Sequence, residues 1–270
     1  MIKKIFLNFN ISIINIAGIN FFVKYVILTI FNIFKIFESR NLNALNNKFK
    51  KLSLNFYREN FYFDIKGIND LSGELNSFGL IREIFFRNIY LKNFIISNPK
   101  KFCCIDLGCN IGVFSLLASK IFKEVKSIDV NKKYIAPFKK IMDDNNTNNF
   151  EFFNYFIGNS PYHEEIKKNY VETIDLNNFI ILNNLKNVFL KIDIEGYEFQ
   201  IIETLDFKNI SALSMEIHQS EGNIEKIIKK ISDNRFNYIL NNDLSEIVND
   251  KEKATYIFAV KENSDINLNI

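Results

Sequence analysis

Short apolar runs alternate with helical patterns from residue 101 to the end of the chain. Apolar runs of roughly four to eight residues are typical of buried strands, and an apolar period of three to four is typical of helices. We predict strands near residues 102–106, 125–129, 150–157, 188–193, 212–218, 236–240 and 254–260. Helices are predicted near residues 112–122, 132–143, 196–205 and 221–233. The last two strands have no helical pattern between them, which favours an antiparallel hairpin.

This alternation predicts an α/β fold in which most strands are parallel. We expect a doubly wound, Rossmann-like sheet with an antiparallel edge strand and a helical N-terminal extension. Residues 1–60 are interpreted as the extension, apolar and helical at first and then a linker. Residues 61–270 are expected to form the α/β domain.

The most apolar stretch of the chain is residues 11–37. Its polar side chains include one stripe at helical spacing, formed by Asn20, Lys24, Asn32 and Lys35. Three interpretations remain open: a helix that packs on the domain, a helix that lies on a membrane surface, and a helix that spans a membrane. A membrane-surface helix would place Lys3, Lys4, Lys24 and Lys35 on its polar side. No small-residue cleavage site follows, so we do not expect a secretory signal.

Charge and cysteine content narrow the class of protein. The net charge of +3 over 270 residues is too small to predict a nucleic-acid groove, so no nucleic-acid partner is expected. The three cysteines, Cys103, Cys104 and Cys109, do not form a disulfide framework. We expect them to be reduced and buried, in a protein of the cytoplasm.

A polar turn interrupts the apolar pattern after the strand predicted at 102–106. That strand ends at Asp106, and Gly108, Asn110 and Gly112 follow before the next helix. Ligands of open α/β sheets bind at this end of the strands, and glycine lets the backbone approach them closely. The turn lacks the glycine pair of a dinucleotide fingerprint and the Lys-Ser or Lys-Thr of a phosphate loop. An acid at the strand end suits an amino group better than a phosphate.

A second acid, Asp129, ends the next predicted strand. It follows Asp106 at about the 20-residue distance of an acid that binds ribose hydroxyls. An amino-acid end and a ribose without phosphate describe S-adenosyl-L-methionine, which we predict as the cofactor. Asp106, Gly108, Asn110 and Gly112 would lie under its methionine end. The alternatives are a plain strand-to-helix turn, and a helix N-cap at Asp129.

Four segments resemble a known family. The first is Asp106-Leu-Gly-Cys-Asn-Ile-Gly112, which resembles the first motif of class I S-adenosylmethionine-dependent methyltransferases. Leu190-Lys-Ile-Asp-Ile-Glu-Gly-Tyr-Glu198 resembles the signature of FkbM-like methyltransferases, and Thr173-Ile-Asp175 and Met215-Glu-Ile-His218 resemble flanking motifs of that family. The resemblance covers roughly residues 80–260 and implies that residues 61–270 are an FkbM-like methyltransferase domain. It also implies that Glu83 and Tyr90 can line the cofactor mouth, although for Glu83 we favour an exposed acid on a helix.

Candidate catalytic residues follow the strands predicted at 188–193 and 212–218. Asp193 and Glu195 alternate with Lys191, so all three share a face if the strand continues, which is costly without partners. His218 ends the next strand and is a natural general base, which Glu216 would orient. We predict His218, Asp193 and Glu195 as the catalytic set, with the base left open between His218 and Asp193. A salt-bridged strand end and a structural histidine are the alternatives.

No spacing in the sequence indicates a strong metal site. Asp193, Glu195 and Glu216 form the one weak candidate for a divalent ion, and we expect no metal. Residues Asn159 to Tyr162, Asn-Ser-Pro-Tyr, faintly resemble a motif of methyltransferases that act on nucleobases. We favour a turn with proline at a preferred position, because the motif would follow the fourth strand and here follows the third.

These patterns together predict a methyltransferase that acts on a hydroxyl of a sugar, glycan, lipid-linked or secondary-metabolite acceptor. A nucleic-acid methyltransferase and a non-catalytic, cofactor-binding scaffold are the alternative functions. The expected partner is a small-molecule or glycan acceptor, and a peripheral membrane contact through residues 11–37 is one of the three interpretations given above. We expect the protein in the cytoplasm, associated with the inner face of a membrane. The oligomeric state stays open.

Overall fold

The computed structural model describes residues 12–32, 48–73, 76–158, 171–244 and 246–269. Its contacts divide the chain into two compact units. The first comprises Met1–Ile89, Ile111–Leu116 and Lys133–Asn148, and the second comprises Tyr90–Asn110, Leu117–Lys132 and Asn149–Ile270. The domain boundary between residues 60 and 61 stays a prediction.

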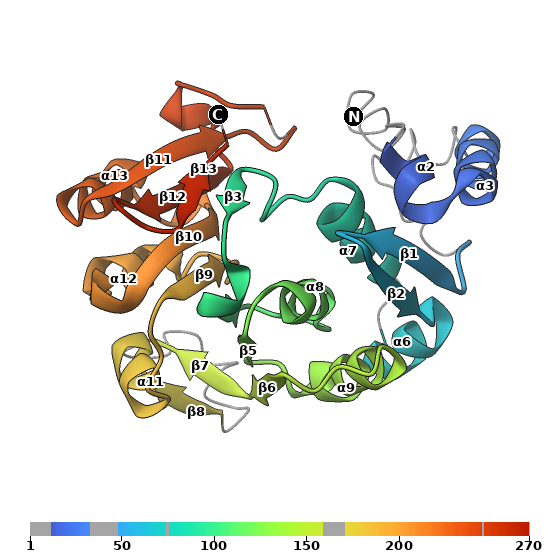
Figure 1. Cartoon of the computed structure of the whole chain (residues 1–270), viewed down its shortest axis with the longest axis horizontal. Coiled ribbons are helices and arrows are strands. Elements are labelled where there is room, and N and C mark those ends of the chain that lie inside the picture. Colours follow the sequence, from blue (N-terminus) through green and yellow to red (C-terminus); the bar gives the residue numbers. More distant parts are fainter. Residues whose placement is uncertain (1–11, 33–47, 74–75, 159–170, 245, 270) are drawn as a thin grey trace. The chain divides into compact units, whose positions relative to one another are not determined.

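The second unit is built on a seven-stranded sheet of order β11-β12-β10-β9-β4-β5-β6 (Figure 1). Its strands are β4 (Cys103–Leu107), β5 (Glu124–Ile128), β6 (Phe150–Phe153), β9 (Val188–Ile192), β10 (Ile210–Glu216), β11 (Phe236–Asn241) and β12 (Tyr256–Lys261). All pairs are parallel except those of β12, which runs antiparallel to both β10 and β11. The predicted fold class, a mostly parallel sheet that ends in an antiparallel hairpin, is confirmed.

The strand order places a ligand site at one position in this sheet. From β4 the chain proceeds to β5 and β6 on one side, and β9 and β10 lie on the other side. The crevice of an open sheet forms where the order reverses, at the carboxyl ends of the strands. Here that point lies between β4 and β9, which are buried along their whole length.

Helices α11 (Leu176–Leu182), α12 (Glu198–Thr204) and α13 (Ile224–Asp233) complete this unit. Helix α13 shows why the chain is helical there, since Ile224, Ile227, Ile228 and Ile231 form one buried face. Its N-cap residue, Asn223, accepts a hydrogen bond from the backbone N–H of Glu225. Helix α8 (Val113–Ile121) follows β4 directly, as predicted.

Two short ladders add to the sheet unit. Strands β7 (Tyr155–Ile157) and β8 (Glu172–Ile174) pair in parallel, and β3 (Phe94–Ile96) pairs with β13 (Ile266–Leu268). The continuous strand predicted at 150–157 is therefore wrong. It is divided at Asn154, whose side-chain amide donates hydrogen bonds to the carbonyl oxygens of Asp129 (2.9 Å) and Val130 (3.0 Å).

The first unit holds a β-hairpin and several helices. Strands β1 (Leu52–Phe56) and β2 (Glu59–Phe63) pair antiparallel, and β1 lies where the sequence analysis expected a linker. The helices are α2 (Ser12–Ala17), α3 (Ile19–Phe31), α6 (Ile65–Ser72), α7 (Ser77–Ile81), a π-helix at Arg82–Phe86 and α9 (Ile135–Asp144). Leu52 and Leu54 point into the core, while Ser53 and Asn55 are exposed, the period-two pattern of a half-buried strand.

The apolar N-terminal stretch forms two helices rather than one. Gly18, with a φ of 83°, separates α2 from α3. Among the described residues, no helix is both long enough and apolar enough to cross a bilayer. The polar stripe predicted on this stretch is not exposed along its whole length. Asn32 is buried, and its side-chain amide donates a hydrogen bond of 2.7 Å to the carbonyl oxygen of Leu28. Lys35 lies outside the described residues.

Candidate functional site

The site begins at the end of β4, where Asp106 is fully buried. Asp106 lies opposite Lys191 in the β4–β9 register, and the Lys191 ammonium is 3.0 Å from its carboxylate. The same ammonium donates a hydrogen bond of 2.8 Å to the carbonyl oxygen of Gly108. Burial alone would lower the pKa of Lys191. The negative charges of Asp106 and Asp193 raise this pKa by more than burial lowers it, so the net shift is upward. Lys191 therefore stays charged, and its hydrogen bond to Gly108 holds the turn after β4 in place.

The backbone conformation of the turn at residues 108–112 explains which residue types it contains. Gly108, Asn110 and Gly112 have φ values of 72°, 51° and 88°. Glycine adopts this left-handed region readily and asparagine tolerates it, which explains why glycine and asparagine occupy these three positions. A Cβ on Gly108 would overlap the backbone carbonyl oxygen of Asp193, so the turn and the segment after β9 meet backbone to backbone.

Asp129, predicted to bind ribose, is tied to that same turn. One carboxylate oxygen accepts the backbone N–H of Asn110 at 2.8 Å, and the other accepts that of Asn131 at 2.8 Å. Burial raises the pKa of Asp129; the two hydrogen bonds lower it, and the net shift is upward. The Asn131 contact is the local cap considered from the sequence, and the Asn110 contact joins the ends of β4 and β5. Because each carboxylate oxygen has a second lone pair, both can also accept a ribose hydroxyl.

The chemistry of this group fits S-adenosylmethionine. Asp106 and Asp129 supply carboxylates at adjacent strand ends, and glycine backbone supplies the close approach. An amino-acid end and a ribose both offer hydrogen-bond donors, which carboxylates accept.

The second half of the site starts with Asp193, directly after β9. The hydroxyl of Tyr90 donates a hydrogen bond of 2.7 Å to its carboxylate, and the Lys191 ammonium is 3.7 Å away. That ammonium also lies 5.0 Å from the centre of the Tyr90 ring, a cation–π contact. Burial raises the pKa of Tyr90, and so does Asp193. Tyr90 thus helps to hold Asp193.

Glu195 leaves the sheet entirely. Strand β9 ends at Ile192, so the predicted alternation along the strand stops before this residue. Glu195 has a φ of 52°, and its side chain is 88% exposed. Its carboxylate lies 3.5 Å from Nε2 of His218, two residues beyond the end of β10.

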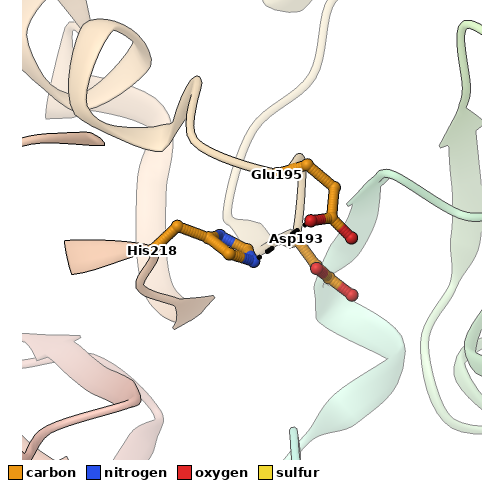
Figure 2. A group of neighbouring side chains, drawn as sticks. All are labelled: Asp193, Glu195 and His218. Atoms are coloured by element: carbon orange, nitrogen blue, oxygen red, sulfur yellow. Dashed lines mark ion pairs between the residues drawn. The ribbon is translucent and has the colours of Figure 1, made fainter. Parts of the chain in front are cut away.

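Figure 2 shows Asp193, Glu195 and His218 as one group. Each side chain offers one atom that could bind a metal ion, and these three atoms lie within 4.8 Å of one another. The three predicted catalytic residues are therefore brought together at the ends of β9 and β10. Two carboxylates and an imidazole are also ligand types that can hold a divalent ion. This candidate metal site differs from the one considered in the sequence analysis, because its third residue is His218 and not Glu216.

The sequence analysis missed Glu198 as a member of the site. Glu198 is completely buried at the start of α12. One oxygen accepts the backbone N–H of His218 at 2.6 Å and lies 2.8 Å from its Nδ1, and the other accepts the backbone N–H of Gly196 at 2.8 Å. The partner of the imidazole is therefore Glu198, and the predicted orienting role of Glu216 is wrong. Glu198 is the last residue of the 190–198 motif, which was the available signal.

This contact favours one tautomer of His218. A carboxylate only accepts hydrogen bonds, so when the ring is neutral Glu198 favours the proton on Nδ1 and leaves the lone pair on Nε2. Burial lowers the pKa of His218; Glu198, Glu195 and Glu216 raise it, and the net shift is upward from 6.5. Nε2 of His218 faces the Glu195 carboxylate, and Asp193 lies beside them (Figure 2).

The cysteines contribute no chemistry here. Cys103, Cys104 and Cys109 are free and buried, as expected. The rival motif at 159–162, for which the sequence analysis favoured a plain turn, lies outside the described residues.

Comparison with known families identifies one match. Residues 97–240, slightly more than half of the chain, match the sequence model of the methyltransferase FkbM domain. No curated protein matches the chain.

Solved structures show weak overall likeness. An rRNA methylase from Streptococcus thermophilus is 10% identical, with 62% of this chain and 89% of that chain covered and a TM-score of 0.39. A precorrin-6y C5,15-methyltransferase from Geobacter metallireducens is 12% identical, with 59% and 80% covered and a TM-score of 0.38. A candidate methyltransferase from Streptococcus mutans in complex with SAH is 12% identical, with 62% and 90% covered and a TM-score of 0.35. At these scores the likeness does not bear on the acceptor.

Proposed function

Since the chain belongs to the family of methyltransferase FkbM domains, with S-adenosylmethionine as methyl donor, we propose that its acceptor is a hydroxyl oxygen. The observation that carries this proposal is the His218 imidazole, whose Nδ1 is held by buried Glu198 while Nε2 faces an open group of carboxylates. A hydroxyl must lose its proton when its oxygen is methylated, and a positioned imidazole is the usual acceptor of such a proton.

The residues divide the work between cofactor and acceptor. Asp106 and the 108–112 turn hold the methionine end, and Asp129 holds the ribose. When bound, the cofactor supplies an electrophilic methyl group, whose bond to sulfur breaks as a bond to the acceptor oxygen forms. His218 accepts the hydroxyl proton at Nε2, and the Glu198 carboxylate stabilises the resulting imidazolium.

Two details favour His218 over Asp193 as the base. The Asp193 carboxylate already accepts the Tyr90 hydroxyl and lies beside the Lys191 ammonium. Both contacts already use acceptor positions of the Asp193 carboxylate. Asp193 is better suited to accept a hydrogen bond from the acceptor and orient it.

The acceptor class follows from the same carboxylates. Glu195 is 88% exposed and free to accept hydrogen bonds from several hydroxyls, which suits a sugar, a glycan or a lipid-linked sugar. Asp193 and Glu195 together disfavour a nucleic-acid backbone, because they would repel its phosphates. We place the protein in the cytoplasm, working at the inner face of a membrane on a small-molecule or glycan acceptor.

The test is methyl transfer from radiolabelled S-adenosylmethionine to a panel of sugars and lipid-linked glycans. We expect transfer to oxygen, and a loss of about two to four orders of magnitude in the His218→Ala variant. The melting shift with S-adenosylhomocysteine should persist in that variant, because His218 is outside the cofactor residues. EDTA should leave the rate unchanged if His218 acts as a base; a loss that Mn²⁺ restores would make it a metal ligand instead. Cofactor binding with no transfer to any acceptor would favour a scaffold.

A further inference from the structure

We propose that the outer side of α3 docks on a bilayer of anionic lipid. Large apolar side chains on this helix are exposed at three- to four-residue spacing: Ile19 (61%), Val23 (47%), Ile27 (46%) and Ile30 (61%), with Phe31 (82%) beside them. Such spacing places them on one side of the helix, and we call these five residues the α3 stripe. Contiguous exposed apolar side chains mark a surface that binds a protein or a membrane.

The opposite side of α3 is already packed. Tyr25 and Thr29 are buried, and the Thr29 hydroxyl donates a hydrogen bond of 2.8 Å to the carbonyl oxygen of Tyr25. Phe21 lies against the rings of Phe49 and Phe78, which stack at 4.3 Å. The helix is thereby fixed in its own unit by its aromatic side, so the stripe is a separate apolar surface.

The charge of the N-terminal segment favours anionic lipid as the partner of the α3 stripe. Residues 1–37 contain four lysines and no acidic residue, so this segment holds more positive charge than the net +3 of the whole chain. Lys24 lies exposed on α3 beside the stripe. Juxtamembrane lysines are attracted to the negative surface of anionic leaflets. Two copies of this chain paired through the same stripe would bring two such segments together, and their charges would repel.

The dimensions agree with a helix that lies in the interface. The 13 residues of α3 extend roughly 20 Å, whereas the hydrocarbon core of a bilayer is about 30 Å thick. An interfacial helix instead inserts its apolar side among the headgroups and keeps its lysines beside the lipid phosphates. Docking of this kind would bring a membrane-bound acceptor near the protein, which goes beyond the methyl transfer itself.

Co-sedimentation of the full chain with vesicles tests the proposal. One set contains phosphatidylcholine alone, and the other contains equal parts of phosphatidylcholine and phosphatidylglycerol. We expect binding to the anionic vesicles, weaker at high salt, and at least tenfold weaker in the Val23→Glu/Ile27→Glu variant. Both side chains are exposed, so the variant should melt like the parent.

The matched control is Ile181→Glu/Leu182→Glu, at exposed apolar residues (65% and 72%) at the end of α11 in the other unit. It should bind vesicles like the parent. Equal binding by the α3 variant, or no binding by the parent, would overturn the proposal. A dimer in solution that the α3 variant abolishes, without vesicle binding, would overturn it in favour of a second copy. The assay needs neither cofactor nor acceptor, so its failure would leave the proposed methyl transfer untouched.

Discussion

Glu198 joins two separate loops at the proposed catalytic group. Its two oxygens hold Gly196 in the segment after β9 and His218 in the segment after β10. A buried carboxylate is expensive unless its lone pairs are satisfied, and here three N–H groups satisfy them. The geometry of the site therefore depends on a side chain that does not itself face the acceptor.

This arrangement predicts the effect of Glu198→Gln on the pH profile. The carboxylates of Glu198, Glu195 and Glu216 raise the pKa of His218, and the imidazole is an effective base only above that pKa. The parent kcat/KM should therefore rise with pH through a midpoint above 6.5. Replacing Glu198 by the neutral amide should move the midpoint to lower pH. It should also reduce the plateau roughly ten- to a hundredfold, because a charge-assisted hydrogen bond is lost.

The matched control for this prediction is Glu203→Gln, on the exposed side of the same helix. It should keep the parent midpoint. A purely structural role for Glu198 would lower the plateau without moving the midpoint, and that outcome would contradict the assignment.

At the scale of elements, the turn after β4 and the segment after β9 form one backbone contact. Gly108 and Gly73 have almost the same φ, 72° and 71°, but a Cβ on Gly108 would overlap the Asp193 carbonyl, whereas a Cβ on Gly73 would meet nothing within 4 Å. Gly73→Ala should cost about 1 kcal/mol of unfolding free energy from backbone strain alone. Gly108→Ala should cost about 3 kcal/mol or more and abolish S-adenosylhomocysteine binding. Denaturant unfolding of both variants checks this, and equal costs would show that the contact is unimportant.

The elements were predictable from the sequence where one apolar pattern dominated. Strands β4, β5 and β9 and helix α13 follow runs or periods that burial alone requires. The strand break at Asn154 was not predictable, because it depends on hydrogen bonds to the segment after β5. Whether the strand reaches Glu195 could not be decided for the same reason: the end of β9 is set by its pairing with β4 and β10, which no local pattern reveals.

The site shows the same division between local and distant signals. Asp106, Gly108, Asn110 and Gly112 could be assigned because their backbone requirements are local. The choice between Glu216 and Glu198 as partner of His218 could not, since period-two alternation favours a neighbour on the same strand over a residue on another helix. Sequence motifs thus pointed to candidate residues, and tertiary contacts decided how their side chains pair.

At the scale of the whole sheet unit, the predicted cofactor residues come from two strands that are neighbours in the sheet, next to the point where the strand order reverses. Asp106 lies near the end of β4 and Asp129 directly follows β5; the two strands pair in parallel, and the hydrogen bond from Asn110 to Asp129 links their ends. A ligand that contacts both ends binds only the folded state, so its binding should stabilise the whole unit.

S-adenosylhomocysteine at 100 times its dissociation constant should therefore add about 2.7 kcal/mol to the unfolding free energy. Asp129→Ala should erase most of this gain, because the variant loses both the ribose contact and the acceptor that positions Asn110. The variant's own stability will also fall, so the quantity to compare is the gain on adding ligand, measured by melting with and without it. Asp143→Ala, an exposed acid on α9, is the matched control and should keep the full gain. A full gain in Asp129→Ala would mean that the ribose is held elsewhere, and the cofactor assignment built on the ends of β4 and β5 would have to be abandoned.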